Sequence, residues 1–371
     1  MILQSRRNRR SHIKQINKQH YYSPIGLDFG NSRIKMIQLH HSSGKPTLCQ
    51  KAICSTPVGS IIEGSIVEPE LFIRQLQMIQ RAIPWKNKQV NCSLPMQATH
   101  SKIVTLPAMN TRHVDQAMHL QAEMLFPVAM NAVDISYCTL NLGDQYRCAD
   151  QQSNLRRQYL LTVVPTETLK IYRSIIEEVG FTLHSFETPV GSLVRSISQA
   201  GQLPSPADGN AAECVIIDFG GKSSTVLIIN RNGSVKFQII AIGCDDFKQA
   251  ILHKWPALKD KAEQALFSAG SLGDKGLLPL AHQLTSAIRK TIAYPAGPGN
   301  SSTNAAYPKI TVCGGGIYIP GLAGHLQNEL GRRLSLYNPL QYLGAEIDKQ
   351  SCSQHNKASL FATAHGLAIW H

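Results

Sequence analysis

The chain has 371 residues, and 43% of them are hydrophobic, which is enough to bury a sizeable core in more than one domain. Lysine and arginine number 37 against 24 aspartates and glutamates, so the formal net charge is +13 at pH 7. The nine cysteines form no CxxC pair, no apolar run reaches about 18 residues, and no secretion signal begins the chain. These features argue against a disulfide-stabilised secreted protein and a membrane-spanning one, and we expect a cytoplasmic protein.

The positive charge is concentrated at the N-terminus. No acidic residue precedes Asp28, while six lysines and arginines lie between Arg6 and Lys18. Residues 1–22 show almost no apolar periodicity, so we expect a disordered basic tail there. Two interpretations of this tail stay open. It is either a solvated extension or an electrostatic contact with an anionic membrane surface, to which each basic residue adds about 1 kcal/mol. Because the charge is so unevenly placed, we expect no nucleic-acid partner.

The first half of the chain opens with a predicted β-hairpin. Residues 25–29 form an apolar strand, residues 30–32 are a polar, glycine-bearing turn, and the return strand runs to Leu39. The later elements follow from apolar periodicity and from their stop signals. They are a helix near 68–82, strands at 91–95 and 103–106, and helices at 111–125 and 166–179.

The opening pattern returns after a turn-rich linker at 199–212. Residues 215–219 form a strand of the buried type, residues 220–224 form the turn, and residues 225–229 form the return strand. A loose Gly-, Ser-, Asn- and Pro-rich segment covers 295–307. The remaining predicted elements are strands at 237–242 and 309–313, a glycine cluster at 314–316, and helices at 321–330 and 358–370.

The two hairpins share one pattern, in which an apolar strand ends in Asp-Phe-Gly and a turn of small polar residues follows. Asp28 and Gly30 hold these places in the first hairpin, and Asp218 and Gly220 in the second. Glycine lets a backbone approach a phosphate closely, and successive turn N–H groups form a concavity that binds anions. An Asp at each strand end suits Mg²⁺, which takes few direct carboxylate ligands. The alternative is two ordinary turns, with each Asp bonded to its own turn backbone.

The candidate binding residues follow from this pattern. Serine hydroxyls can add donors to a phosphate, and a lysine can neutralise its charge. A glycine cluster between a strand and a helix suits a nucleotide base or ribose, although it is equally typical of a flexible connection. The candidates are Asp28 and Asp218 for the metal, Gly30, Asn31, Ser32, Lys35, Gly220, Gly221 and Ser223 for phosphates, and Gly314, Gly315 and Gly316 for the nucleoside. No catalytic residue is assigned, because the sequence shows no nucleophile elbow and no close Ser/His/Asp grouping.

The order of these motifs is similar to that of the actin/Hsp70/sugar-kinase superfamily. Within it, the chain resembles the PilM family of cytoplasmic actin-like proteins in type IV pilus assembly. The resemblance covers roughly residues 23–371, and a set of short segments carries it. They are Gly26–Lys35, Leu106–Met109, Ile217–Gly221, Ala241–Gly243, Cys313–Leu322, Tyr337–Pro339 and Phe361–Ala368.

The resemblance implies an α/β, actin-like (ribonuclease-H-like) two-lobed ATPase fold with a small inserted α+β subdomain. The first lobe would cover 23–200 with the insert near 104–165, a linker would cover 201–212, and the second lobe would cover 213–371. ATP with Mg²⁺ would lie in a cleft between the lobes. The implied partners are the N-terminal cytoplasmic peptide of PilN, a protein of the bacterial inner membrane, and through it PilO and PilP. The protein would then be recruited to the inner face of that membrane.

The chain departs from the family pattern on the adenosine side of the site. Gln238 replaces the usual arginine, Cys244 the usual second glycine, and Ala287 an acidic residue, while the helix around Glu263 lacks its lysine. We therefore expect a nucleotide-responsive docking platform with weak or absent ATP hydrolysis.

Two other functions are less well supported by the sequence. A small-molecule kinase of the same superfamily needs a catalytic carboxylate near the acceptor hydroxyl, and no separate aspartate stands in such a context. An FtsA-like cell-division protein is expected to end in an amphipathic membrane helix, whereas this chain ends at Ile369-Trp370-His371.

Overall fold

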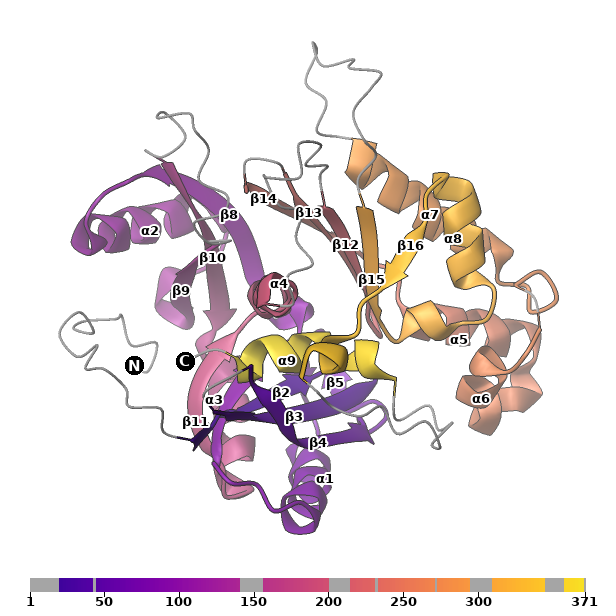
Figure 1. Cartoon of the computed structure of the whole chain (residues 1–371), viewed down its shortest axis with the longest axis horizontal. Helices are drawn as coiled ribbons and strands as arrows, with labels where there is room; N and C mark the ends of the chain where they lie inside the picture. The colour runs from indigo at the N-terminus through magenta and orange to yellow at the C-terminus, as the bar shows by residue number, and fades with distance from the viewer. Residues whose placement is uncertain are drawn as a thin grey trace. The chain divides into compact units, whose positions relative to one another are not determined.

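The structure is a computed structural model of the chain, and it describes residues 20–42, 45–140, 156–199, 214–230, 233–270, 272–293, 309–343 and 357–369. The described residues fall into two compact units (Figure 1). Unit 1 contains the residues up to Leu140, residues 156–199 and the C-terminal part from Pro339 onward. Unit 2 contains residues 214–338. Each unit is built around a mixed β-sheet that begins with one of the two predicted hairpins.

The main sheet of unit 1 has the strand order β1-β3-β2-β7-β11, with β4 also paired to β3. The strands β2 and β3 are the antiparallel first hairpin, and β7 and β11 continue the sheet in parallel to β2. The strands are β1 (Tyr21–Tyr22), β2 (Ile25–Phe29), β3 (Arg33–His41), β4 (Thr47–Ser55), β7 (Gln89–Ser93) and β11 (Thr182–Glu187).

Helices cover both faces of this sheet. Side chains alternate between the faces along a strand, so Ile25, Leu27 and Phe29 lie on the face that packs against α1 (Pro69–Ala82) and α3 (Thr166–Glu178). The opposite face of β2 and β7 is contacted by α9 (Ala362–Ala368), which also packs against α4 (Pro189–Gln199). Shorter elements complete the unit: β5 (Ile61–Ile62), β6 (Ser65–Ile66), η1 (Met96–Ala98), η7 (Pro339–Leu343) and η9 (Ala358–Phe361).

A small sheet with its own core occupies the segment where the inserted subdomain is expected. Its three antiparallel strands have the order β8-β10-β9, and α2 (Thr111–Leu125) packs against them. The helix begins after Asn110, which caps it: the Asn110 side-chain oxygen accepts a hydrogen bond from the backbone N–H of His113. The remaining elements are β8 (His100–Pro107), η2 (Met130–Ala132), β9 (Val133–Thr139) and β10 (Arg156–Pro165).

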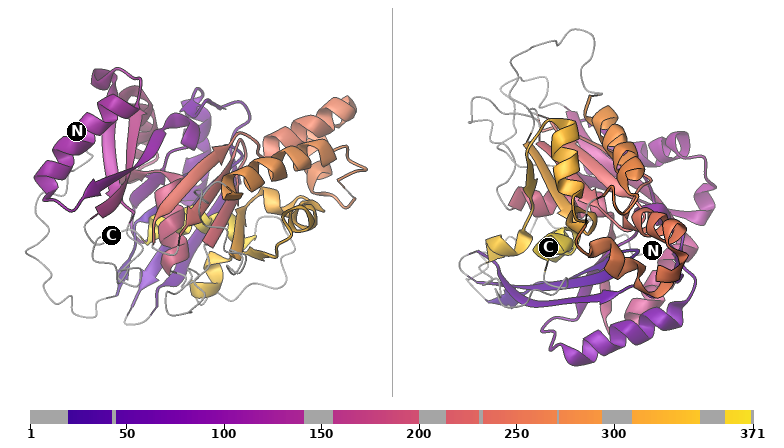
Figure 2. Two further views of the ribbon diagram at one scale, coloured as in Figure 1. Left: turned by 90° about the horizontal axis from the view of Figure 1, so that it is seen from above. Right: turned by 90° about the vertical axis from the view of Figure 1, so that its right-hand side faces the viewer.

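The sheet of unit 2 repeats the central arrangement of unit 1. Its order is β14-β13-β12-β15-β16, in which an antiparallel hairpin (β12 and β13) is extended by a parallel strand, β15. The helices α7 and α8 pack beside each other (Figure 2). The strands are β12 (Cys214–Phe219), β13 (Ser224–Ile229), β14 (Val235–Ile240), β15 (Lys309–Gly314) and β16 (Leu334–Leu336). The helices are α5 (Cys244–Lys254), η5 (Pro256–Lys261), α6 (Ala262–Phe267), α7 (Leu278–Ala293), η6 (Gly316–Tyr318) and α8 (Leu322–Leu330).

The structure differs from the predicted domain limits at both ends of the chain. The predicted disordered tail ends too late, because Tyr21 and Tyr22 pair with His41 and His40 as strand β1, and residues 1–19 lie outside the described residues. The second lobe, predicted to run to residue 371, ends at Asn338. Residues from Pro339 onward belong to unit 1, since α9 packs on β2 and α4. The predicted linker at 201–212 and the loose segment at 295–307 lie outside the described residues.

A search of the described residues for membrane spans found no helix with the length and apolarity that crossing a bilayer requires.

Candidate functional site

The first candidate turn, residues 30–32, joins β2 to β3. A side chain at Gly30 would place its Cβ 2.6 Å from the carbonyl oxygen of Arg33 and 2.8 Å from Lys35 Nζ, so this position requires glycine. Thr56, which directly follows β4, donates its hydroxyl to the Gly30 carbonyl (2.6 Å) and its N–H to the Ser32 carbonyl (3.0 Å). The turn therefore has a defined shape that neighbouring backbone holds in place.

Asp28 at the end of β2 is held by two side chains. Lys35 lies opposite it in the antiparallel register, and Lys35 Nζ is 2.7 Å from Asp28 Oδ2. The hydroxyl of Ser93, at the end of the parallel neighbour β7, donates to Asp28 Oδ1 (2.7 Å). The carboxylate is thus bonded to side chains from two neighbouring strands and not to its own turn backbone. Lys35, predicted to meet a phosphate, stands beside the predicted metal ligand and neutralises it.

The other two members of this turn are more open to solvent. Asn31 and Ser32 are half-buried, and the amide of Asn31 donates to Gln97 Oε1 at 3.4 Å. Gln97 belongs to η1, which follows β7. The turn is therefore flanked by η1 on one side and by Thr56 on the other, and its polar groups lie at the surface of unit 1.

The second candidate turn joins β12 to β13 and is closed by a hydrogen bond from Gly220 N–H to the Ser223 carbonyl (3.0 Å). The start of α5 packs against it, because the N–H groups of Cys244 and Asp245 donate to the carbonyls of Gly220 and Gly221. A side chain at Gly243, just before α5, would overlap the backbone of Gly221. Helix α5 therefore determines the conformation of this turn through backbone contacts.

Parallel pairing of β12 with β15 brings the third glycine cluster to Asp218. Asp218 and Phe219 lie opposite Cys313 and Gly314 in the sheet register. The thiol of Cys313 donates to Asp218 Oδ1 at 3.7 Å, the longer distance that sulfur allows. Gly314 has φ +84°, and a Cβ there would overlap Asp218 Oδ1, so only glycine fits.

The other two glycines of the cluster differ in their surroundings. A Cβ at Gly316 would meet Phe219 Cβ at 2.8 Å and Cys244 Sγ at 3.3 Å, so Gly316 is close-packed against the hairpin and α5. Gly315 precedes η6 with ordinary right-handed backbone angles. Gly314 and Gly316 thus need glycine for packing, and they surround the end of β12 together with the thiols of Cys244 and Cys313.

The first turn of α5 carries two carboxylates beside the second candidate turn. Asp246 accepts a hydrogen bond from the Gly243 N–H (2.8 Å), which caps the helix. Asp245 forms an ion pair with Lys248 (2.6 Å) and lies 3.9 Å from Lys222 in the turn itself. Negative charge at a helix N-terminus is favourable, so these side chains occupy a position that also attracts phosphates.

Each predicted set of residues is therefore brought together within its own unit. The five candidates from Asp28 to Lys35 share one hairpin in unit 1, and Asp218, the Gly220 turn and the 314–316 cluster surround one strand end in unit 2. A two-sided clamp formed by both sets stays a prediction. Sequence reasoning missed Thr56 and Ser93, which have no local signal, and Asp246, which the Gly-x-x-Asp spacing of a helix cap indicates.

The residues present fit a Mg²⁺-nucleotide in their chemistry. Gly30 and Gly220, which open the two turns, leave no room for a Cβ, and glycine lets a backbone approach a phosphate closely. Within the described ranges, no cluster of three or more His, Cys, Asp or Glu side chains is placed to hold a metal ion. Such a cluster is not needed for Mg²⁺, which is usually bound by one or two carboxylates, substrate phosphates and several waters.

Comparison with solved structures shows the fold. One match is to the structure described as the "PilM-PilN type IV pilus biogenesis complex", which is 18% identical in sequence. The superposition covers 94% of this chain and 98% of the matched chain, with a TM-score of 0.75. The ethanolamine utilization protein EutJ from Carboxydothermus hydrogenoformans is 11% identical, with coverage of 96% and 92% and a TM-score of 0.55. The predicted α/β, actin-like fold is thereby confirmed.

A protein-family model shows which family the chain belongs to. The model for the type IV pilus assembly protein PilM matches residues 26–371, which is nearly the whole chain. It includes both candidate turns and the glycine cluster. The predicted resemblance is confirmed, and the chain belongs to the PilM family of type IV pilus assembly proteins.

Proposed function

We propose that the chain is a nucleotide-binding scaffold of type IV pilus assembly, which binds ATP with Mg²⁺ and docks the N-terminal cytoplasmic peptide of PilN. The observation that carries the nucleotide site is the pair of glycine-dependent turns, each of which follows a strand whose last two residues are Asp-Phe. PilM family membership and the similarity to a PilM–PilN complex support the partner.

The residues of unit 1 would meet one end of the nucleotide phosphates. The backbone at Gly30, with Asn31 and Ser32, would supply donors, and Lys35 would add a positive charge. Lys35 is shared, because its ammonium already pairs with Asp28. Asp28 keeps its hydrogen bond from Ser93 when Lys35 turns towards a phosphate, so a buried carboxylate is not left without a partner.

The residues of unit 2 would meet the other end. Gly220, Gly221 and Ser223 would face phosphates, and the bare backbone at 314–316 would lie against the nucleoside. Bound Mg²⁺ neutralises phosphate charge, and Asp28 and Asp218 are the carboxylates that would hold it through its waters.

Slow hydrolysis or none is part of the proposal. Asp28 is already bonded to Lys35 and Ser93. Beside the Gly220 turn, the first helical turn of α5 carries the carboxylates of Asp245 and Asp246. The nucleotide would then act as a conformational ligand whose binding is coupled to that of the peptide.

The proposed location is the inner face of the bacterial inner membrane, where the cytoplasmic segment of PilN emerges. Contact with PilO and PilP would be indirect, through PilN. The basic residues before position 19 lie outside the described residues, and their contact with anionic lipid belongs to the same proposal.

The test is isothermal titration of the full chain with Mg-ATP and with a synthetic peptide of the N-terminal segment of PilN from the same genome. We expect saturable binding of both, with a peptide affinity that changes when Mg-ATP is present. A scrambled peptide of the same composition is the control. Absence of peptide binding with and without nucleotide would remove the partner from the proposal, and absence of Mg-ATP binding would remove the nucleotide site.

A further inference from the structure

Three neighbouring parallel strands of unit 1 place polar or small residues on the face opposite the α1–α3 core. On β2 these are Gly26 and Asp28, and on β7 they are Asn91 and Ser93. On β11, Glu187 lies opposite Ser93 in the register. Residues two apart on a strand share a face and lie about 7 Å apart. Each of β2 and β7 therefore carries two same-face residues, one at the candidate site and one deeper in the sheet.

Helix α9 lies directly on the deeper pair. A Cβ at Gly26 would overlap the carbonyl oxygen of Ala364, so the backbones of β2 and α9 are in contact with no side chain between them. A Cβ at Gly366 would likewise overlap the carbonyl oxygen of Ser192 in α4. Such contacts leave no room for sliding, and close-packed interiors transmit displacements. We therefore expect a shift of α9 to displace β2.

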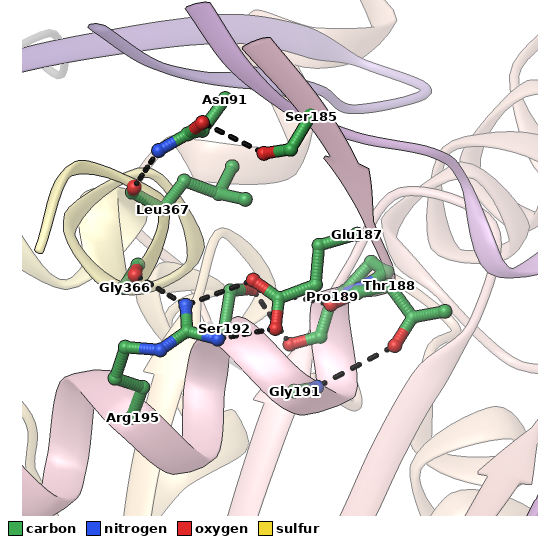
Figure 3. Close-up of polar contacts among 10 residues, drawn as sticks. All are labelled: Asn91, Ser185, Glu187, Thr188, Pro189, Gly191, Ser192, Arg195, Gly366 and Leu367. Atoms are coloured by element: carbon green, nitrogen blue, oxygen red, sulfur yellow. Dashed lines mark hydrogen bonds and ion pairs between the residues drawn. The ribbon is translucent and has the colours of Figure 1, made fainter. Parts of the chain in front are cut away.

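The last carbonyls of α9 accept hydrogen bonds from a side chain of β7 and from a side chain of α4 (Figure 3). A helix leaves its final carbonyls without partners inside the helix. Asn91 donates its amide to the Leu367 carbonyl (3.0 Å), and Arg195 donates to the Gly366 carbonyl (2.7 Å). Arg195 also forms a two-pronged ion pair with the buried carboxylate of Glu187 at the end of β11 (Figure 3).

Strands β2 and β7 thus each contact α9 through one residue and the candidate phosphate site through the residue two positions further along. Gly26 contacts α9 and Asp28 pairs with Lys35 on β2, while Asn91 caps α9 and Ser93 bonds Asp28 on β7. Undocking of α9 would remove one hydrogen-bond partner from the buried amide of Asn91 and one from the partly buried guanidinium of Arg195, which is costly. The position of Asp28 and the docking of α9 are therefore linked by contiguous, buried contacts.

We propose that α9 is a positioning element for the phosphate turn of unit 1, with Arg195 and Asn91 as its positioning residues. Docked α9 favours nucleotide binding at the Asp28–Lys35 turn, and bound nucleotide favours docked α9, because coupling between two sites is reciprocal. The inference rests on the proposed nucleotide site. It adds that the C-terminal helix regulates this site, so a partner that engages α9 changes nucleotide affinity.

The first measurement uses the unmodified full chain. Hydrogen exchange of the amides in Ala362–Ala368 is followed by mass spectrometry with and without saturating Mg-ATP. We expect exchange in this helix to slow at least 5-fold when Mg-ATP binds, in keeping with the usual size of such couplings. Binding of Mg-ATP with unchanged exchange in α9 would overturn the inference and leave the proposed function intact.

The second measurement uses a charge-neutral replacement of the pair, Glu187→Gln with Arg195→Met. This double variant removes the donor to the Gly366 carbonyl without leaving a buried charge alone. We expect faster exchange in α9 and an Mg-ATP dissociation constant at least 5-fold higher. Arg195→Lys keeps one positive charge near Glu187 and should restore part of the affinity. Equal affinity of the double variant and the parent would contradict the coupling.

The matched control is Arg173→Met. Arg173 is also a helical arginine of unit 1 in an ion pair, here with Glu177 on α3, away from α9. Its Mg-ATP affinity and the exchange of α9 should equal those of the parent. If the parent itself binds no Mg-ATP, the nucleotide site fails and the inference fails with it. That outcome differs from the one in which nucleotide binds but α9 does not respond.

Discussion

Ser93 on β7 donates a hydrogen bond to Asp28 on β2, and 2.7 Å separate Ser93 Oγ from Asp28 Oδ1. The two residues are 65 positions apart in the chain and meet because β2 and β7 are paired in parallel. This bond orients the carboxylate from the side opposite the paired lysine. The bond from Ser93 does not involve Lys35, so it can hold the Asp28 carboxylate both when Lys35 pairs with that carboxylate and when, as we propose, Lys35 turns to a phosphate.

Replacing Asp28 with asparagine should weaken Mg²⁺-dependent nucleotide binding and leave the chain folded. Asparagine keeps an oxygen acceptor for Ser93 but loses the charge that would hold Mg²⁺. We expect about tenfold weaker binding of Mg-ATP, or about 1.4 kcal/mol, by titration calorimetry. Asp218→Asn should behave alike, and Asp260→Asn, at an exposed position of η5, is the control. Parent-like affinity in both site variants would show that the turns do not form the site.

Replacement of Gly366 and of Gly324 by alanine should change the free energy of unfolding in opposite directions. A Cβ at Gly366 in α9 would overlap the Ser192 backbone, so Gly366→Ala should destabilise the fold by about 1–3 kcal/mol or more. A Cβ at Gly324 in α8 meets no atom within 4 Å, so Gly324→Ala should stabilise by about 0.5–1 kcal/mol. Urea unfolding of both variants gives the comparison. A stable Gly366→Ala variant would mean that α9 does not pack as closely as described.

Removal of Arg195 alone should cost more than removal of the whole ion pair. Arg195→Met leaves the buried Glu187 carboxylate uncompensated, and such a loss is worth about 3–5 kcal/mol. The double variant with Glu187→Gln should recover a large part of this free energy of unfolding. Burial raises the pKa of Glu187 while Arg195 lowers it, so the single variant should also raise that pKa further. A double-mutant cycle in urea without any coupling would contradict the buried pair.

Acidification should destabilise unit 1 through His365. Burial lowers the pKa of this imidazole to about 4 from 6.5, and its Nδ1 lies 2.8 Å from Ser196 Oγ. As the pH falls, His365 therefore binds a proton near pH 6.5 in the unfolded chain but only near pH 4 in the native chain. The native state is favoured in full above pH 6.5, and stability is lost progressively as the pH falls towards 4, by about 3 kcal/mol at most.

The measurement for His365 is urea unfolding at pH 7.5 and pH 4.5 for the parent and for His365→Gln. Glu187 changes the pH dependence of stability in the opposite direction, because a carboxyl with a raised pKa in the native state stabilises the fold at low pH and loses that contribution as the pH rises. The difference between parent and variant isolates the histidine. An identical pH dependence in both proteins would show that His365 is not the responsible group.

Local patterns predicted the elements that carry strong signals. The hairpin at 25–39 and its repeat at 215–229 were recognisable because strand alternation and glycine turns are local features. Helix 111–125 was recognisable from its apolar stripe. Helix α4 was missed although Val190, Leu193, Val194 and Ile197 recur at helical spacing. Ser192 and Ser196 between them are buried as well, and that burial follows from the packing of α4 against α9, which only the tertiary structure shows.

The candidate site divides in the same way. The repeated spacing predicted Asp28, Gly30, Asp218 and Gly220 as site residues. The spacing repeats because the chain contains two hairpins with the same strand-turn-strand arrangement. The pairing of Lys35 with Asp28 and the contact of Gly314 with Asp218 were not predicted. Those contacts depend on strand register and on a parallel partner from a distant part of the chain.

The sequence by itself determined the actin-like class of this PilM family member, its two hairpins and the residue types of its candidate phosphate turns. Only the tertiary structure decided that the C-terminal helix α9 belongs with the first hairpin, where it packs against Gly26 and is capped by Asn91 and Arg195. The reason is physical. Turn chemistry and strand alternation act between neighbours in the chain, whereas the docking of a short helix depends on backbone contacts and buried carbonyl partners that form only when distant segments pack together.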